Sequence, residues 1–113
     1  MSTSTEVVDR LGAALNARDM DAAMACFTED CVFEDTEPAP DGTRYVGRDA
    51  LRAAWGPMFS DASIRFETEE VIEAGDRVVE LTRYSWSDGH VRGVEVYRMR
   101  DGLISELYAY VKG

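Results

Sequence analysis

Three turn signals recur at regular intervals in the second half of the chain, and they constrain the fold more than any other feature. The pairs Gly75-Asp76, Asp88-Gly89 and Asp101-Gly102 separate runs that are rich in β-branched and aromatic residues. Such pairs favour tight β-hairpin turns, and strands joined by tight turns lie antiparallel to each other. The alternation of the first run breaks near Glu69-Glu70, which predicts a β-bulge. The sequence therefore predicts a four-stranded antiparallel meander, with strands over residues 64–72, 77–87, 90–100 and 103–111.

The first half of the chain has helical periodicity. Apolar residues at intervals of three and four predict an amphipathic helix over residues 5–17. Asp19 is a suitable N-cap for a second helix, whose apolar stripe would include residues 20–27. A third helix is predicted over residues 47–55, and Pro57 should end or kink it because the proline ring clashes with the preceding turn.

Helices followed by a meander indicate an α+β fold, in which the helices pack on one face of a curved sheet. The 113 residues form a single domain, 1–113, that is long enough to bury a core of its own.

Charge and composition exclude several classes of partner. The formal net charge is -10, with 22 acidic residues against 12 basic ones, which argues against nucleic-acid binding because phosphate neutralisation needs a basic face. No apolar run approaches the roughly 18 residues of a membrane span. The polar N-terminus lacks an apolar leader segment, so the expected location is the cytoplasm. The spacing of Cys26 and Cys31 matches no zinc site, and we expect two buried, reduced thiols, with no metal and no cofactor.

A short strand over residues 31–35 ends in a carboxylate that could have a chemical role. Side chains alternate along a strand, so Phe33 and Asp35 point to the same face. If Phe33 faces the core, Asp35 lies at the rim of a pocket, just before the loop Pro38–Gly42. A carboxylate in that position is a candidate general base. The alternative is a solvated carboxylate that caps the loop.

A second carboxyl group is predicted on the same side of the sheet. Without a bulge, Glu95 shares a face with Val91, Gly93 and Tyr97, whereas a bulge at Gly93 would leave it on the surface. Two carboxyl groups in unlike environments can act as an acid and a base. His90, the single histidine, is either a surface residue beside a turn or a further acid/base group at the rim. On the last strand, the pocket-facing residues should be Leu107, Ala109 and Val111.

Several segments resemble one known superfamily. They are Asn16–Met24 together with Phe27–Phe33, the helix start Gly47-Arg-Asp-Ala-Leu, and the final hairpin from Val94 to Leu107. With the order of the elements, they resemble the nuclear transport factor 2-like superfamily, and most of all its SnoaL-like polyketide cyclases and ketosteroid isomerases. The resemblance covers nearly the whole chain. It implies a cone-shaped curved antiparallel sheet wrapped around the N-terminal helices, enclosing an apolar pocket.

The resemblance also implies roles for individual residues. Asp35 falls where ketosteroid isomerases have their general base, and Glu95 falls where they have a protonated carboxylic acid that donates to an oxyanion. The tyrosine of their first helix is replaced by Leu11, and Tyr45, Tyr84 or Tyr97 could substitute for it. We expect the substrate-binding wall to comprise Leu11, Leu15, Phe33, Trp55, Phe59, Tyr84, Trp86, Tyr97 and Leu107.

Three functions remain open at this point. The first is cofactor-independent proton transfer, an isomerisation or aldol-type cyclisation of a small hydrophobic carbonyl compound. The second is non-catalytic binding of a hydrophobic ligand, or a role in assembly, which Leu11 favours. The third is an epoxide-hydrolase-like network in which Arg83 or Arg92 joins the two carboxylates. Tyr108 and Tyr110 should lie on the outer sheet face, where they suggest a homodimer.

Overall fold

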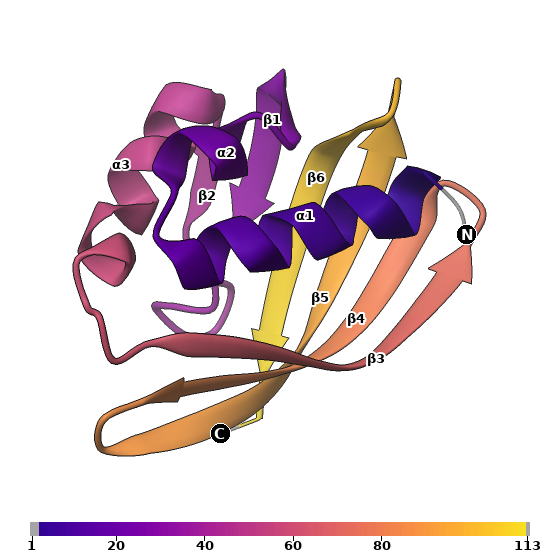
Figure 1. The fold of residues 1–113 in the computed structure, drawn as a ribbon. Helices are drawn as coiled ribbons and strands as arrows, with labels where there is room; N and C mark the ends of the chain where they lie inside the picture. The colour runs from indigo at the N-terminus through magenta and orange to yellow at the C-terminus, as the bar shows by residue number, and fades with distance from the viewer. Residues whose placement is uncertain (1–2, 113) are drawn as a thin grey trace.

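The computed structural model describes residues 3–112 as three helices and one curved sheet (Figure 1). The elements in chain order are α1 (Thr3–Ala17), α2 (Met20–Met24), β1 (Phe27–Glu34), β2 (Arg44–Val46), α3 (Arg48–Phe59), β3 (Arg65–Ala74), β4 (Arg77–Trp86), β5 (Gly89–Arg100) and β6 (Leu103–Val111). None of the helices within the described residues is long and apolar enough to cross a membrane.

The six strands form one sheet in the order β2-β1-β6-β5-β4-β3. The predicted meander of β3 to β6 is confirmed, and so is the bulge in β3, where the pairing with β4 shifts between Thr68 and Glu70. Asp101 and Gly102 both have positive φ angles, of 55° and 79°, as a tight hairpin turn requires. One feature was not predicted: β1 pairs with β6 in parallel, so the helices and β2 connect to the meander through its last strand.

The start of β1 corrects the predicted boundary of the second helix. Asp19 does cap α2, because its side chain accepts a hydrogen bond from the Ala22 N–H. The helix nevertheless ends at Met24, and Phe27 begins β1 opposite Ile104 instead of extending the helical stripe. Phe27 is fully buried, with its ring edge-on to Trp55 at a centroid distance of 5.6 Å. Burial between sheet and helix therefore outweighs the helical spacing of this apolar residue.

The third helix also departs from its prediction. It runs from Arg48 to Phe59 and does not end at Gly56-Pro57. The rings of Trp55 and Phe59 stack across the proline at a centroid distance of 6.2 Å. This packing stabilises the last turn even though proline lacks the N–H that would otherwise bond within the helix.

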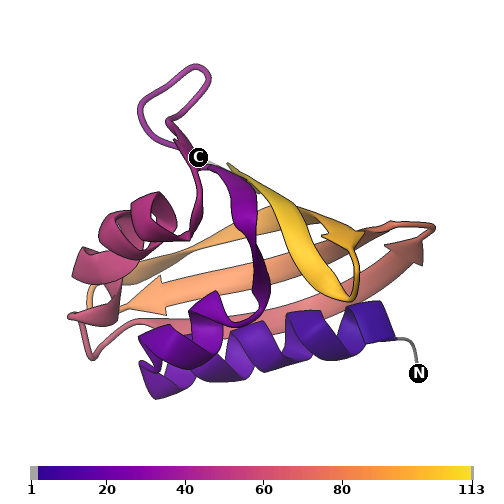
Figure 2. The same ribbon diagram turned by 90° about the horizontal axis from the view of Figure 1, so that it is seen from above.

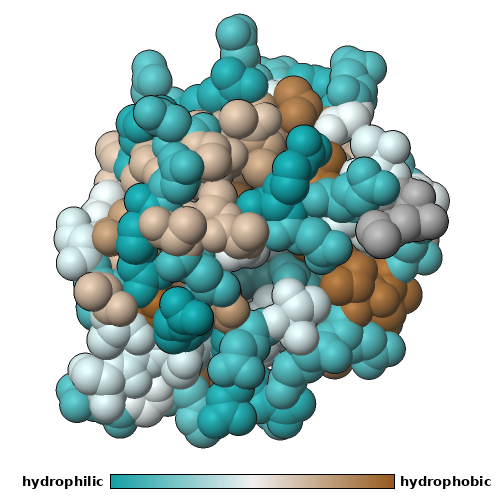
Figure 3. Space-filling model, in the orientation of Figure 1, coloured by the Kyte–Doolittle hydropathy of each residue, from teal (hydrophilic) through white to brown (hydrophobic). Residues whose placement is uncertain are grey.

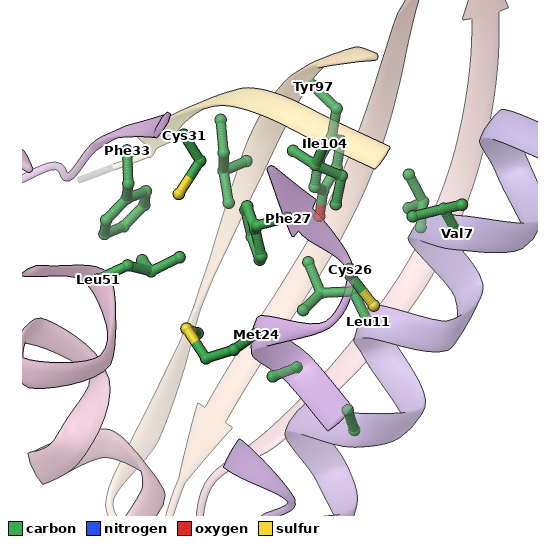
Figure 4. Close-up of a cluster of buried hydrophobic side chains, with 14 of the residues drawn as sticks. Val7, Leu11, Met24, Cys26, Phe27, Cys31, Phe33, Leu51, Tyr97 and Ile104 are labelled. Carbon is green, nitrogen blue, oxygen red and sulfur yellow. The ribbon is translucent and has the colours of Figure 1, made fainter. Parts of the chain in front are cut away.

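The core lies between the concave face of the sheet and the three helices. Figure 2 shows α1 running along this face, with the loop between β1 and β2 projecting away from the sheet. The side-chain amide of Asn16 donates to the Phe66 carbonyl oxygen and accepts the Phe66 N–H, and these two hydrogen bonds fix α1 to β3. Figure 4 shows how residues from α1, β1, β5 and β6 converge in the core. The largest fully buried side chains are Phe27, Leu11, Leu51, Ile104, Val7, Val8, Val78 and Cys31.

Hydrophilic side chains cover much of the face that carries α1, with smaller apolar patches between them (Figure 3). Cys26 and Cys31 are both buried and unbridged, as predicted. The acidic residues of β3 are exposed at the edge of the sheet, where charge opposes pairing with another strand.

Candidate functional site

The concave face of the sheet and the helices enclose a cavity of about 890 Å³. This volume lies within the range of pockets that hold drug-sized molecules. The space exists partly because β5 and β6 carry small residues at this point: Gly93 faces the cavity, and Ala109 lies opposite Glu95. A Cβ atom at Gly93 would lie 2.5 Å from the Tyr110 carbonyl oxygen, so only glycine permits this close approach of the two strands.

Most of the predicted wall residues line this cavity. They are Leu11, Leu15, Phe33, Trp55, Tyr84, Trp86, Tyr97 and Leu107. Phe59 does not line it, because the continued helix stacks its ring on Trp55 instead. Phe66 was not anticipated, and its ring packs edge-on against Tyr84 at a centroid distance of 4.9 Å. The wall is therefore largely aromatic and apolar, and it suits a hydrophobic ligand.

Asp35 lies immediately after β1 and lines the cavity. Its N–H donates to the Thr43 carbonyl oxygen at 2.9 Å, and its Oδ1 accepts the Thr36 N–H at 2.7 Å. The loop folds back so closely that a Cβ atom at Gly42 would lie 1.7 Å from the Asp35 carbonyl oxygen, and Gly42 has a φ of +77°. A glycine at this position thus lets the backbone around Asp35 close tightly. The other oxygen of the Asp35 carboxylate has no hydrogen-bond partner among the described residues.

Glu95 lies in the middle of β5 and also lines the cavity. No register shift occurs near Gly93, so Glu95 shares the inner face with Val91, Gly93 and Tyr97 as the alternation predicts. None of residues 3–112 hydrogen-bonds its carboxyl group, which faces the cavity. Burial raises the pKa of Glu95 to about 8, and the nearby charges of Glu80 and then Asp35 contribute further. Glu95 is therefore mostly a neutral carboxylic acid at pH 7.

Glu80, a third carboxyl group of the cavity, was not predicted from the sequence. Glu80 lies on β4 directly opposite Glu95 and is buried, with 6% of its surface exposed. It accepts hydrogen bonds from the hydroxyls of Tyr97 and Thr68. The signal was present in the sequence, because the hairpin at Asp88-Gly89 pairs Trp86 with Gly89 and the same register pairs Glu80 with Glu95.

The cavity is acidic and contains no basic residue among those that line it. Every ion pair within residues 3–112 uses a carboxylate outside the cavity. Arg92 pairs with Glu69 at 2.9 Å, and neither Arg83 nor Arg92 lines the cavity, so the arginine network of an epoxide hydrolase is not formed. The seven carboxyl groups that line the cavity are Asp9, Asp35, Glu37, Asp61, Glu67, Glu80 and Glu95.

Of the other residues considered for the site from the sequence, some line the cavity and others lie outside it. Leu11 lines the cavity and is 1% exposed, so the first helix provides no hydroxyl at this position. Tyr84 and Tyr97 line the cavity, whereas Tyr45 does not and stacks on Phe33. The Tyr97 hydroxyl donates to Glu80 Oε1 at 2.7 Å, and burial raises the pKa of Tyr97 well above its usual value. His90 is exposed and does not line the cavity.

Several solved structures share this fold. A nuclear transport factor 2-like protein of unknown function from Mesorhizobium loti is 39% identical, with a TM-score of 0.88 over 98% of this chain and 92% of that one. A computationally designed binder of 17-OHP is 25% identical, with a TM-score of 0.84 over 97% of this chain and 91% of the other. A provisionally assigned polyketide cyclase from Sinorhizobium meliloti is 24% identical, with a TM-score of 0.81 over 96% of this chain and 99% of the other.

No curated protein is significantly similar to the chain in sequence. The family model for the SnoaL-like domain matches residues 8–107, which include α2, α3, β1 to β5 and most of α1. This match and the Mesorhizobium loti structure agree with a curved sheet that packs against N-terminal helices. The chain therefore belongs to the SnoaL-like family within the nuclear transport factor 2-like fold.

Proposed function

We propose that this protein catalyses cofactor-independent proton transfer beside the carbonyl group of a hydrophobic molecule, as an isomerisation or an aldol-type cyclisation. Asp35 takes a proton from the carbon next to the carbonyl. The electron pair of that C–H bond forms the C=C bond of the enolate, and the π pair of the C=O bond moves onto the oxygen. Glu95, as a neutral acid, donates a hydrogen bond to the enolate oxygen. Asp35 then returns the proton to a carbon atom in an isomerisation. In a cyclisation the enolate carbon instead forms a C–C bond with a second carbonyl carbon, and Asp35 returns the proton to the alkoxide oxygen that results.

One observation carries this proposal above the others: the Glu95 carboxyl group accepts no hydrogen bond from residues 3–112, faces a cavity with a largely aromatic wall and has a pKa raised to about 8. A carboxylic acid that stays neutral at pH 7 can donate a hydrogen bond, which a carboxylate cannot. Asp35 lines the same cavity, and its charge is one cause of the raised pKa of Glu95. The two groups thus have the unlike environments that an acid and a base need.

The acidic lining further narrows the substrate class. Seven carboxyl groups without a basic residue disfavour a carboxylate or phosphate ligand by charge repulsion. The aromatic wall favours a flat or polycyclic apolar compound. The designed relative binds 17-OHP, which supports a neutral hydrophobic ligand in a cavity of this fold.

The direct test is hydrogen–deuterium exchange at the carbon beside the carbonyl of a neutral bicyclic ketone, α-tetralone, followed by NMR in D₂O. We expect the protein to accelerate exchange, and the acceleration to decline above about pH 8 as Glu95 loses its proton. Because a single ionisation removes the donor, the decline should approach about tenfold per pH unit at high pH.

A matched anion and a matched variant complete this experiment. Tetrahydro-1-naphthoate has a similar ring system but a negative charge, and we expect it neither to bind nor to inhibit exchange. In Glu95→Gln the amide is a neutral donor at every pH, so any residual exchange should no longer decline above pH 8. An alkaline decline that persists unchanged in Glu95→Gln would remove Glu95 from the mechanism.

Non-catalytic binding is the second candidate, and Leu11 is the observation that favours it. The buried leucine leaves the oxyanion with one fewer donor than the resemblance implies. Under this alternative, α-tetralone would quench the fluorescence of Trp55 and Trp86 without any acceleration of exchange. The same samples therefore distinguish the two functions.

We also propose that two copies of the chain associate through the outer face of the sheet. The strand register brings six apolar or aromatic side chains together on this face, and Tyr110 is 61% exposed. Contiguous apolar surface of this kind is typical of protein interfaces. The six residues are Val79, Leu81, Val94, Val96, Tyr108 and Tyr110.

Sedimentation velocity tests the dimer directly. We expect the native chain to sediment as a dimer and Val96→Asp to sediment as a monomer, because the substitution puts a charge in the centre of the proposed interface. Asp41→Asn changes one exposed charge in the loop between β1 and β2, away from this face, and should leave the dimer intact. A native chain that is monomeric at all concentrations would contradict the proposal.

A further inference from the structure

Glu80 and Glu95 form a cross-strand pair of carboxyl groups at the floor of the cavity. They lie directly opposite each other on β4 and β5, and both line the cavity. Residues in this relation have Cβ atoms roughly 4.5–5.5 Å apart, so two charges here would repel each other strongly. Within residues 3–112, no arginine, lysine or histidine lines the cavity to compensate them. One proton shared by the pair removes this repulsion.

The hydrogen bonds around the pair are unequal. Glu80 Oε1 accepts the Tyr97 hydroxyl at 2.7 Å, and Glu80 Oε2 accepts the Thr68 hydroxyl. Glu95 accepts no hydrogen bond from the described part of the chain. Donors that point at a carboxylate stabilise its ionised form, so Glu80 is the member that the surroundings favour as the anion.

Both donors are held in place by the sheet. Tyr97 is two residues from Glu95 on β5 and is 3% exposed, so its hydroxyl has little freedom to turn elsewhere. Thr68 lies where the register of β3 shifts, and a bulge of this kind redirects the side chains beside it. The position of Glu80 is thus determined by three strands together.

We propose that Glu80 is a positioning residue of this site: it takes the ionised place in the cross-strand pair, so that the shared proton stays on Glu95 and faces the cavity. The pair itself follows from the strand register and hydrogen bonds, and its part in the reaction rests on the proposed function. Glu80 lies opposite Glu95 on the neighbouring strand and acts on the reaction only through Glu95.

The other titratable groups around the pair also favour the proton on Glu95 over Glu80. Asp9 on α1 and Asp35 after β1 are the acidic neighbours, and Cys26 lies near Tyr97. Burial, with a smaller contribution from Asp9, raises the pKa of Glu80, and its two hydrogen bonds from Thr68 and Tyr97 offset only part of that rise. For Glu95 burial, Glu80 and Asp35 all raise the pKa, and no hydrogen bond opposes them.

The test is the titration of the Glu95 carboxyl carbon by ¹³C NMR in Glu80→Gln. This substitution preserves the shape of the side chain and removes its charge. We expect the midpoint of Glu95 to fall by about one pH unit or more, because a like charge beside it is lost. Glu70→Gln, which removes an exposed charge outside the cavity, should leave the midpoint unchanged. An unchanged or higher midpoint in Glu80→Gln would overturn the proposal.

Tyr97→Phe provides a second test that keeps both carboxyl groups. Loss of the hydroxyl makes Glu80 a better proton acceptor, so the proton becomes divided between the two residues. We expect the single titration of Glu95 to separate into two steps, with Glu80 changing over the same two pH ranges. If Glu95 still titrates in one step at its original midpoint, the Tyr97 hydroxyl does not direct the proton, and the proposal fails.

These titrations separate the inference from the proposed function. A shifted Glu95 midpoint without any ketone exchange in the native protein would support the pair and reject proton transfer as the activity. Ketone exchange with a Glu95 midpoint that ignores Glu80 would support the activity and reject the role of Glu80.

Discussion

Replacement of Asp35 with asparagine should reduce the exchange of the ketone α-proton by about 10²–10⁴-fold, the typical contribution of a positioned general base. Asparagine has nearly the same shape as aspartate but cannot accept the proton from carbon. The Asp35 Oδ1 bond to the Thr36 N–H can be kept by the amide oxygen, so the loop should retain its conformation. Deuterium exchange of α-tetralone by NMR measures the rate, and tryptophan fluorescence measures binding.

Asp41→Asn is the matched control for this prediction. Asp41 lies in the same loop, is exposed and does not line the cavity, so its loss should leave the exchange rate unchanged. Binding of α-tetralone should persist in Asp35→Asn, since the aromatic wall is intact. Equal exchange rates in the native protein and Asp35→Asn would show that another group removes the proton.

Truncation of Phe27 to alanine should destabilise the protein by about 3–5 kcal/mol, the usual cost of deleting a fully buried aromatic side chain. Phe27 has no exposed surface and contacts Trp55 edge-on, so its loss leaves a cavity between β1 and α3. The same change weakens the wall to which Trp55 belongs. Urea unfolding, monitored by tryptophan fluorescence, gives the free energy of unfolding.

Phe59→Ala is the matched control, because it removes the same side chain from a less buried position. Phe59 is half-buried near the end of α3, where its main ring contact is the stacked Trp55. Its loss should cost clearly less than the loss of Phe27, because fewer buried contacts disappear. Equal losses for the two variants would mean that burial of Phe27 between sheet and helix is not the source of its effect.

The alternation and the turn residues of the second half predict the inner face of the sheet well. Gly75, Asp88-Gly89 and Asp101-Gly102 define the hairpins, and the last strand was predicted with the observed bounds, Leu103–Val111. Because side chains alternate with a period of two, a correct hairpin register also assigns Glu95 to the cavity. The same register count places Glu80 opposite Glu95, but only when the pairing of β4 with β5 is taken into account.

The helical half was less predictable where apolar residues fit two structures equally well. Phe27 continues the spacing of Met20 and Met24, yet it lies in β1 because Ile104 and Trp55 surround it there. Pro57 should interrupt α3 on local grounds, yet the stacking of Trp55 on Phe59 carries the helix past it. In both places, contacts between distant residues decide the backbone conformation.

The sequence by itself therefore determined the meander and the α+β class, and it grouped Phe33 with Asp35 and Glu95 with Tyr97 on common strand faces, because turn chemistry and the period of a strand are local properties. Only the tertiary structure decided that β1 pairs in parallel with β6, that Phe59 turns away from the cavity, and that Tyr97 and Thr68 donate to Glu80. These features depend on which distant strands and helices meet. The protonation of Glu95 belongs to the second group, since it follows from burial and from the charge of a residue fifteen positions away on the neighbouring strand.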